Sequence, residues 1–368
     1  MLKEVAEAIE RQDYKRATQL LKPLMEKESD NLWVRFYVGR VQEATGRREM
    51  AEKIYRYLLP KTSNFKLIAQ IRQGLERLEA IAQQEKQAAL DQAKSAPGGE
   101  DLGVLILEPV PSELKSTVAE SFAKIINTDA YTARLQIPSR GWRLYRTGLM
   151  GELEYYVGCL QKAHIPCFAL ALNRLELMQV LEVHYFQTVD QSVVVRCQNK
   201  EEQEGNFTFD WSEVRQRVDG RIPLFESVVV FDAKRNLKRK TQTQDYVPFC
   251  DLHIPSRHCI LRFCDRNYQF RKGINLETSP ENAPHHALEQ ETVSQHWKQL
   301  TAFLDQQLPD IPLWSDFSTF ADSATGFPEM LQRIPAHVRL ERRQPSVWDA
   351  AFQLYSGLVF WRDRLTSS

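Results

Sequence analysis

A spacing of 34 residues near the start of the chain constrains its fold more than any other feature of the sequence. The first set of related positions is Asp13, Tyr14, Ala17, Leu21 and Leu24, and the second set is Arg47, Arg48, Ala51, Tyr55 and Leu58. A recurring unit of this length predicts a pair of helices that stacks on the next pair. Residues 1–90 also contain almost no strand pattern. We therefore expect this whole region to be helical.

These positions resemble the tetratricopeptide repeat (TPR), a helix–turn–helix unit of about 34 residues. In that family a small residue lets the two helices cross closely, and Gly39 and Ala51 stand at those positions. Large residues fill the space around the crossing, and Tyr55 is one of them. The resemblance covers residues 31–62, and a degenerate copy precedes it in residues 1–28. Gln42 and Gln12 depart from the family pattern, so the alternative is a helical bundle whose period is accidental.

The resemblance implies a groove lined by one face of the first helix of the repeat. By register on Gly39 and Ala51, the lining positions are Trp33, Phe36, Arg40 and Glu43. Aromatic residues and arginine are enriched at the centres of protein interfaces. We therefore expect the groove to bind a helix or an extended segment of another protein. The alternative is that Trp33 and Phe36 pack against the first helix pair.

The segment SAPGGED at residues 95–101 is rich in turn residues, and the sequence pattern changes after it. Predicted strands and helices alternate up to residue 175, as in a small α/β sandwich with helices on one face. The first of these strands is followed by EPVPSE instead of a glycine-rich loop. We therefore expect no nucleotide cradle at this point.

Residues 176–275 contain a series of strand-like segments separated by turns, which is typical of an antiparallel barrel or sandwich. An acidic segment and amphipathic helices follow, and we expect these helices to pack on the preceding domain. The predicted fold class is α+β multidomain: N-terminal TPR-like helical hairpins, a small α/β sandwich, and an antiparallel β barrel-like domain with C-terminal helices. The predicted boundaries are a helical domain at 1–94, a linker at 95–101, the sandwich at 102–175, the barrel-like domain at 176–275 and the C-terminal segment at 276–368.

The charge balance excludes bulk binding of nucleic acid, because 48 basic side chains are matched by 48 acidic ones. Six cysteines in 368 residues are too few for a secreted disulfide scaffold. The first residues lack the apolar core of a signal peptide, and we expect no transmembrane segment. We predict a cytoplasmic protein without a cofactor, with a peripheral position on a membrane as the alternative.

Five potential metal ligands lie close together in the sequence: Cys250, His253, His258, Cys259 and Cys264. Short spacings of thiols and imidazoles are typical of zinc sites. Along a strand, however, Cys250 shares a face with Leu252 and Ile254, and His253 lies on the opposite face. Ligands that alternate between two faces do not converge on one ion. Core packing is therefore our main interpretation, and a zinc site is the alternative.

The densest run of positive charge is KRNLKRK at residues 234–240, between two predicted strands. Its basic residues are Lys234, Arg235, Lys238, Arg239 and Lys240. One interpretation is a solvated hairpin tip that resists aggregation. The other is a site for an anion: a lipid headgroup, an acidic protein or nucleic acid. No aromatic residue that could stack on bases lies within the tip, which makes nucleic acid the weaker choice.

No nucleophile or metal motif of the forms G-x-S-x-G, C-x-x-C or H-E-x-x-H occurs in the sequence. We therefore predict a non-enzymatic protein that binds other proteins, as an assembly factor or scaffold does, through a short TPR-like groove. Two alternatives stay open. One is binding of an anionic ligand through residues 234–240, and the other is an enzyme of unfamiliar type.

Overall fold

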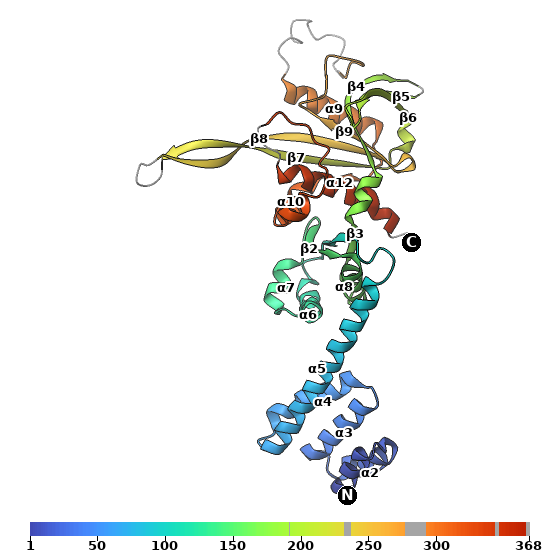
Figure 1. Ribbon diagram of the computed structural model, residues 1–368, viewed down its shortest axis with the longest axis vertical. Helices are drawn as coiled ribbons and strands as arrows, with labels where there is room; N and C mark the ends of the chain where they lie inside the picture. The colour runs from blue at the N-terminus through green and yellow to red at the C-terminus, as the bar shows by residue number, and fades with distance from the viewer. Residues whose placement is uncertain (191, 232–236, 277–291, 343–345, 366–368) are drawn as a thin grey trace. The chain divides into compact units, whose positions relative to one another are not determined.

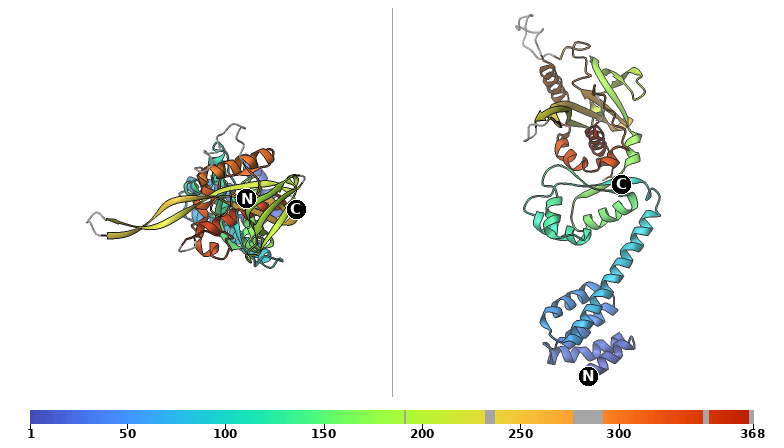
Figure 2. Two further views of the ribbon diagram at one scale, coloured as in Figure 1. Left: turned by 90° about the horizontal axis from the view of Figure 1, so that it is seen from above. Right: turned by 60° about the vertical axis from the view of Figure 1, so that its left-hand side comes forward.

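The computed structural model describes residues 1–190, 192–231, 237–276, 292–342 and 346–365 (Figures 1 and 2). Side chains are described for these residues except in 226–241 and 363–365. The chain divides into two compact units, Met1–Gln92 and Ala93–Ser368. It mixes helices and sheets, with the helical region at its N-terminus, as the sequence predicts.

The N-terminal unit is built from helical hairpins. Its helices are α1 (Leu2–Glu10), α2 (Tyr14–Lys27), α3 (Leu32–Ala44), α4 (Arg48–Leu58) and α5 (Phe65–Lys94), the last of which continues into the second unit. Asp13 and Asn31 begin α2 and α3, because their side chains accept hydrogen bonds from backbone N–H groups of the first turn.

The 34-residue spacing also appears in the backbone geometry of this unit. Gln12 and Gly46 stand 34 positions apart, and both are left-handed, with φ of 60° and 79°. Asp13 and Arg47 follow them with nearly equal angles, φ −86° and ψ 73° against φ −86° and ψ 62°. The equivalent buried positions are Ala17 with Ala51, Leu21 with Tyr55, and Leu24 with Leu58. The two hairpins therefore repeat one local geometry, and Gln12 adopts at its turn the conformation that glycine favours.

Tyr55 fills the centre of the second hairpin. A Cβ atom added at Gly39 of α3 would lie 2.7 Å from Cε1 of the Tyr55 ring, and one added at Gly74 of α5 would lie 2.6 Å from Cε2. Real Cβ atoms do not approach other atoms this closely. The two glycines therefore let both helices pack against opposite edges of the same ring.

The second unit begins with a three-stranded sheet of order β2-β1-β3, which is antiparallel throughout. The elements are β1 (Leu102–Leu107), α6 (Lys115–Ile126), α7 (Ala130–Gln136), β2 (Arg143–Leu149), α8 (Met150–Lys162) and β3 (Cys167–Ala171). The three helices pack on one face of this sheet, against Leu105 and Leu107. The other face, with Val104 and Ile106, packs against the C-terminal helices.

A larger sheet has the order β10-β7-β8-β9-β4-β5-β6. Its strands are β4 (Gln179–Val189), β5 (Val193–Gln198), β6 (Glu204–Phe209), β7 (Gln216–Phe231), β8 (Leu237–Ile254), β9 (Cys259–Cys264) and β10 (Leu313–Trp314). The pairs β4–β9 and β10–β7 are parallel, and the other neighbours are antiparallel. The first and last strands of this order do not pair with each other. The predicted barrel-like domain is therefore wrong, since the sheet is not closed.

Helices cover both faces of the larger sheet, which is why it needs no closure to bury its apolar side chains (Figure 1). They are α9 (Val293–Gln307) on one face, and α10 (Phe317–Ala324), α11 (Pro328–Leu331) and α12 (Val347–Leu365) on the other. The core beneath α12 also contains Val104 and Phe168 of the small sheet. The regions that the sequence divides at residue 175 therefore share one core. No described helix is both long enough and apolar enough to cross a bilayer.

Strands β7 and β8 extend beyond this sheet as a two-stranded ribbon, which is visible in both figures. Strand β10 pairs with β7 only at Arg217 and Val218, and β9 pairs with β8 only along Phe249–Ile254. The pairing of β7 with β8 continues outward to Phe231 opposite Leu237.

Candidate functional site

Helix α3 carries the four residues that the sequence assigns to a groove. Its first turn is fixed by Asn31, whose side-chain oxygen accepts a hydrogen bond from the backbone N–H of Trp33 at 3.0 Å. The helix ends just before Gly46, whose left-handed backbone turns the chain toward α4. One side of α3 packs into the core formed with α4 and α5.

The four residues lie on two stripes of the helix instead of one. At about 100° per residue, Trp33 and Arg40 lie roughly 20° apart, while Phe36 and Glu43 are turned away from them by about 60°. Trp33 is half-buried, and the Arg40 side chain is 36% exposed. Phe36, in contrast, is only 1% exposed. Its ring packs on Tyr55, with 5.8 Å between centroids, so Phe36 is a core residue in this structure and not part of an open groove.

Tyr37 completes the half-exposed stripe, although the sequence pattern did not single it out. Its ring centroid is 6.1 Å from that of Trp33. Burial raises the pKa of Tyr37, the charge of Glu10 in α1 raises it further, and Arg40 opposes both. The stripe is therefore bordered by α1 as well. The sequence could have identified Tyr37, because spacings of four and three residues from Trp33 to Tyr37 to Arg40 place all three on one side of a helix. We call these three residues the α3 row.

Glu43 is held by its neighbours within the unit. Its carboxylate accepts hydrogen bonds from Tyr55 Oη at 2.6 Å and from Arg77 of α5 at 2.7 and 3.1 Å. Burial alone would raise the pKa of Glu43, but the hydrogen bonds from Arg77 and Tyr55 and the charges of Arg77 and Arg40 outweigh it and lower the pKa. Arg40 lies farther away, 3.9 Å from the same carboxylate. The strong contacts of Glu43 thus lock α5 to the hairpin.

The basic run lies largely outside what the structure describes. Lys234 and Arg235 are not among the described residues, and for Lys238, Arg239 and Lys240 only the backbone is described. These last three residues belong to β8 and pair with Val230, Val229 and Val228 of β7.

The Cys/His cluster is divided between the two faces of the sheet. Cys250 and Cys259 belong to the core under α9, Cys264 belongs to the core under α12, and His258 is exposed. Burial raises the pKa of Cys259 and of Cys264 to about 12, which keeps both thiols protonated, whereas zinc binds thiolates. Among the residues with described side chains, no group of three or more His, Cys, Asp or Glu is placed to hold a metal ion.

His253, Ser356 and Asp251 form a network with the residue types of a hydrolase triad but without its geometry. Ser356 Oγ donates to Asp251 Oδ2 at 2.6 Å and lies 2.9 Å from His253 Nε2. Because the serine proton is used on the carboxylate, His253 Nε2–H must donate to Ser356, and its Nδ1 carries no proton. In a triad the carboxylate orients the histidine and the histidine accepts the serine proton. All three residues are also 0% exposed, so the network joins α12 to β8 and no substrate can reach it.

This network predicts a fall in stability of the second unit on acidification. Burial lowers the pKa of His253 from 6.5 to about 4, although the charge of Asp251 acts in the opposite direction. The unfolded chain takes up this proton near pH 6.5 and the folded chain does not, so stability present above pH 6.5 is lost as the pH falls toward 4. The loss from this residue is about 3 kcal/mol. Urea unfolding at stepped pH should show a shallower slope in His253→Gln, and an unchanged slope would contradict the assignment.

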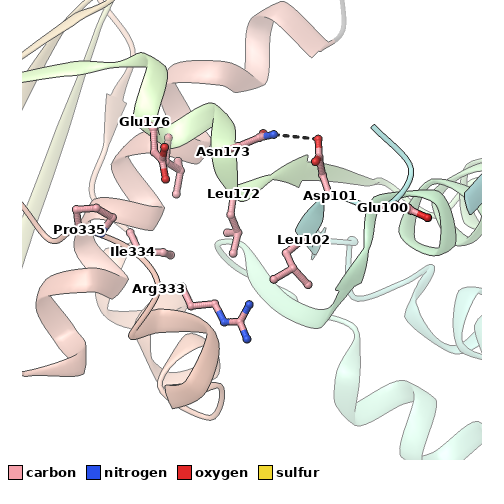
Figure 3. A pocket seen from close by; sticks show the side chains of 10 residues that line it. Glu100, Asp101, Leu102, Leu172, Asn173, Glu176, Arg333, Ile334 and Pro335 are labelled. Carbon is pink, nitrogen blue, oxygen red and sulfur yellow. Dashed lines mark hydrogen bonds between the residues drawn. The ribbon is translucent and has the colours of Figure 1, made fainter. Parts of the chain in front are cut away.

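A hollow of about 280 Å³ lies between the residues around β1, the segment after β3 and the segment after α11 (Figure 3). Asn173 donates a hydrogen bond to Asp101 at its rim at 2.9 Å. Carboxylates and Arg333 line the hollow together with leucines, but no serine, cysteine or histidine does. The lining therefore offers no nucleophile paired with a base.

Comparison of the chain with known protein families, with curated proteins and with solved structures found no match in any of the three.

Proposed function

We propose that this protein binds another protein through the α3 row and acts in the assembly or scaffolding of a complex. The observation that carries the proposal is the exposure of this row beside a buried stripe of the same helix. Trp33 and Tyr37 are adjacent aromatic rings that pack on the core from one side and stay partly exposed on the other, and Arg40 follows them on the same face. These residue types contribute most to binding energy at protein interfaces.

The electrostatics of α3 favour a partner with a carboxylate. The oxygens of Glu43 already accept the hydrogen bonds of Arg77 and Tyr55, and Arg40 makes only a 3.9 Å ion pair with it. Arg40 can therefore form a shorter, charge-assisted bond with an incoming acidic side chain. An apolar side chain of the same partner segment would pack on Trp33 and Tyr37. A helix or an extended segment can present both groups.

The repeated hairpin geometry supports the TPR-like interpretation of this unit. Left-handed turns at Gln12 and Gly46 and equivalent buried positions one period apart are what a stacked helical repeat requires. In such repeats the first helices of successive hairpins line one surface. The neighbours of the α3 row fit this arrangement, because Glu10 lies on α1 and Arg77 lies on α5.

The Trp33→Ala, Arg40→Ser variant should lose partner binding by roughly 1,000-fold, since truncating each of two interface hot spots costs about 2 kcal/mol or more. The experiment is affinity purification of the tagged full chain from its native cells, with mass spectrometry of the proteins retained by wild type and by variant. Proteins that the wild type retains and the variant loses are the expected result.

A matched control lies on helix α4 and just beyond it. Tyr57 is 44% exposed, and Lys61 Nζ lies 3.9 Å from the centroid of its ring, so this pair also combines an aromatic ring with a cation, at another place. The Tyr57→Ala, Lys61→Ser variant should retain the same proteins as the wild type. Equal loss in both variants, or an unfolded N-terminal unit in the circular dichroism of the first, would overturn the proposal.

A further inference from the structure

Strand β3 forms one edge of the small sheet, and none of the described strands pairs with its outer side. The backbone N–H of Glu108 donates to the carbonyl of Pro166 at 3.0 Å, one position beyond the register of β1 with β3. Backbone groups of an antiparallel strand point alternately toward and away from the neighbouring strand. Even-numbered residues of β3 therefore face β1, and the odd-numbered ones turn their backbone groups outward: Cys167, Ala169 and Ala171.

Part of this outer edge opens on a cavity. The carbonyl of Cys167 accepts a hydrogen bond from Gln161 Nε2 of α8 at 2.9 Å, which closes the edge at that end. Ala169 and Ala171, in contrast, line a second hollow of about 470 Å³. It adjoins the hollow of Figure 3, with which it shares Asp101. We call it the β3 hollow. A strand edge that opens on a hollow can accept an extended segment as an additional strand.

The lining of the β3 hollow carries an excess of negative charge. Glu154 of α8 and Glu176 after β3 are exposed, and neither makes an ion pair or a side-chain hydrogen bond with another described residue. Asp101 adds a third carboxylate. Arg174 is the one cation in the lining, and its guanidinium carbon lies 5.3 Å from the centroid of the Trp361 ring. The hollow therefore favours a positively charged occupant.

We propose that the β3 hollow binds an extended segment of another protein, which pairs with β3 as an added strand and carries lysine or arginine. Main-chain hydrogen bonds to Ala169 supply the pairing, and alternate side chains supply the specificity. Ala169 lies opposite Leu105, on the face of the sheet that α8 covers, and Glu154 of α8 can bind a basic side chain there. Leu177, which is 60% exposed in the same lining, offers an apolar contact. This proposal is independent of the α3 row.

Other occupants account for fewer of these features. The carboxylates of the β3 hollow would repel nucleic acid or an anionic lipid. A free polyamine would satisfy the carboxylates, but it would leave the outward backbone groups of Ala169 without a partner. An extended basic segment satisfies both the strand edge and the carboxylates.

The test measures the fluorescence anisotropy of labelled pentapeptides mixed with the full-length protein. Valine alternates with lysine in one peptide, with arginine in a second and with glutamate in a third. A fourth is the lysine peptide methylated on its backbone nitrogens. We expect the lysine and arginine peptides to bind, and the other two to bind at least about tenfold more weakly. The glutamate peptide lacks the positive charge, and the methylated peptide lacks the N–H donors that a strand needs.

Two variants of the protein test the two parts of the site. Ala169→Pro removes an outward N–H and leaves the bonds to β1 intact, as an edge strand tolerates, and binding should fall at least about tenfold. Glu154→Gln, Glu176→Gln should weaken binding roughly tenfold and reduce its dependence on salt. The matched control Glu113→Gln, Glu120→Gln removes the same charge from exposed positions outside the hollow, so it should bind within about twofold of wild type.

Wild-type protein that binds neither basic peptide, or a glutamine variant of the hollow that binds them normally, would refute the proposal. So would normal binding by Ala169→Pro at an unchanged melting temperature, and if this variant melts early, the methylated peptide tests the pairing instead. Undiminished binding of the methylated peptide would show a site for a cation alone, such as a polyamine, and would exclude the added strand. The Trp33→Ala, Arg40→Ser variant should bind the peptides as the wild type does, which separates failure here from failure of the α3 row.

Discussion

Replacing Tyr55 by alanine should destabilise the N-terminal unit by about 3–5 kcal/mol. The ring is 0% exposed and occupies the space that Gly39 and Gly74 leave between α3 and α5, so its removal creates a cavity at the centre of the unit. The substitution also removes the hydroxyl that donates to Glu43 at 2.6 Å. The loss is measured by urea unfolding followed with circular dichroism, with hydrogen exchange to assign it to residues 1–92.

Two further variants test how much of this loss comes from the ring of Tyr55. One removes only its hydroxyl, and the other removes a ring at a more exposed position of the same helix. Tyr55→Phe keeps the ring and should cost about 1 kcal/mol, because Glu43 retains its bonds to Arg77. Tyr57→Ala, two residues later on the same helix, removes a partly exposed ring and should cost less than about 1 kcal/mol. If Tyr55→Ala unfolded no more readily than Tyr57→Ala, the central role of this ring would be disproved.

Replacing Arg262 by methionine should destabilise the second unit by about 3–5 kcal/mol. Arg262 is 1% exposed and donates to both oxygens of Asp251, which is 0% exposed, at 2.9 and 2.7 Å. It also donates to the backbone carbonyls of Ala336 and His337, both at 3.0 Å. The substitution leaves a buried carboxylate without its counter-ion, and Ser356 alone cannot replace two charge-assisted bonds. Urea unfolding monitored by tryptophan fluorescence measures the effect.

Arg257 provides an exposed control of the same geometry. Its guanidinium donates twice to Glu213, at 2.7 Å in each case, and once to the carbonyl of Thr208 at 2.8 Å, but its side chain is 44% exposed. Because water screens this pair, Arg257→Met should cost no more than about 1 kcal/mol. The double variant Asp251→Asn, Arg262→Met should cost less than the sum of its single variants, since it removes both charges together. Strict additivity would show that the two groups do not stabilise each other.

Much of the helical region could be predicted because its determinants are local. The 34-residue spacing of Ala17 and Ala51, and of Leu24 and Leu58, reflects a buried stripe that any helix with this periodicity must cover. The strand faces around Cys250 and Cys259 were predictable for the same reason, because side chains alternate along a strand whatever its neighbours are. The position of Phe36 was not predictable in this way. Four residues spaced by three, four and three span an arc wide enough to include both core and surface, and only the placement of α4 and α5 decides between them.

Contacts between distant parts of the chain could not be predicted from the sequence. Asp251 and Ser356 are 105 residues apart, Arg262 and His337 are 75 apart, and Glu43 and Arg77 are 34 apart. No local sequence pattern predicts such pairs, because each of these polar residues, taken alone, could equally well lie exposed at the surface. The open sheet was mispredicted as a barrel for a related reason. The spacing of turns indicates where strands end, but it does not indicate which strands lie at the edges of the sheet.

The sequence by itself therefore determined the local elements: where helices and strands run, and which of their faces are apolar, because both depend on spacings within one segment. Only the tertiary structure decided which of those faces remain exposed. It buried Phe36 completely and left Trp33, Tyr37 and Arg40 partly exposed, and it carried β7 and β8 beyond the other strands as a ribbon. The physical reason is that exposure is set by what the rest of the chain covers.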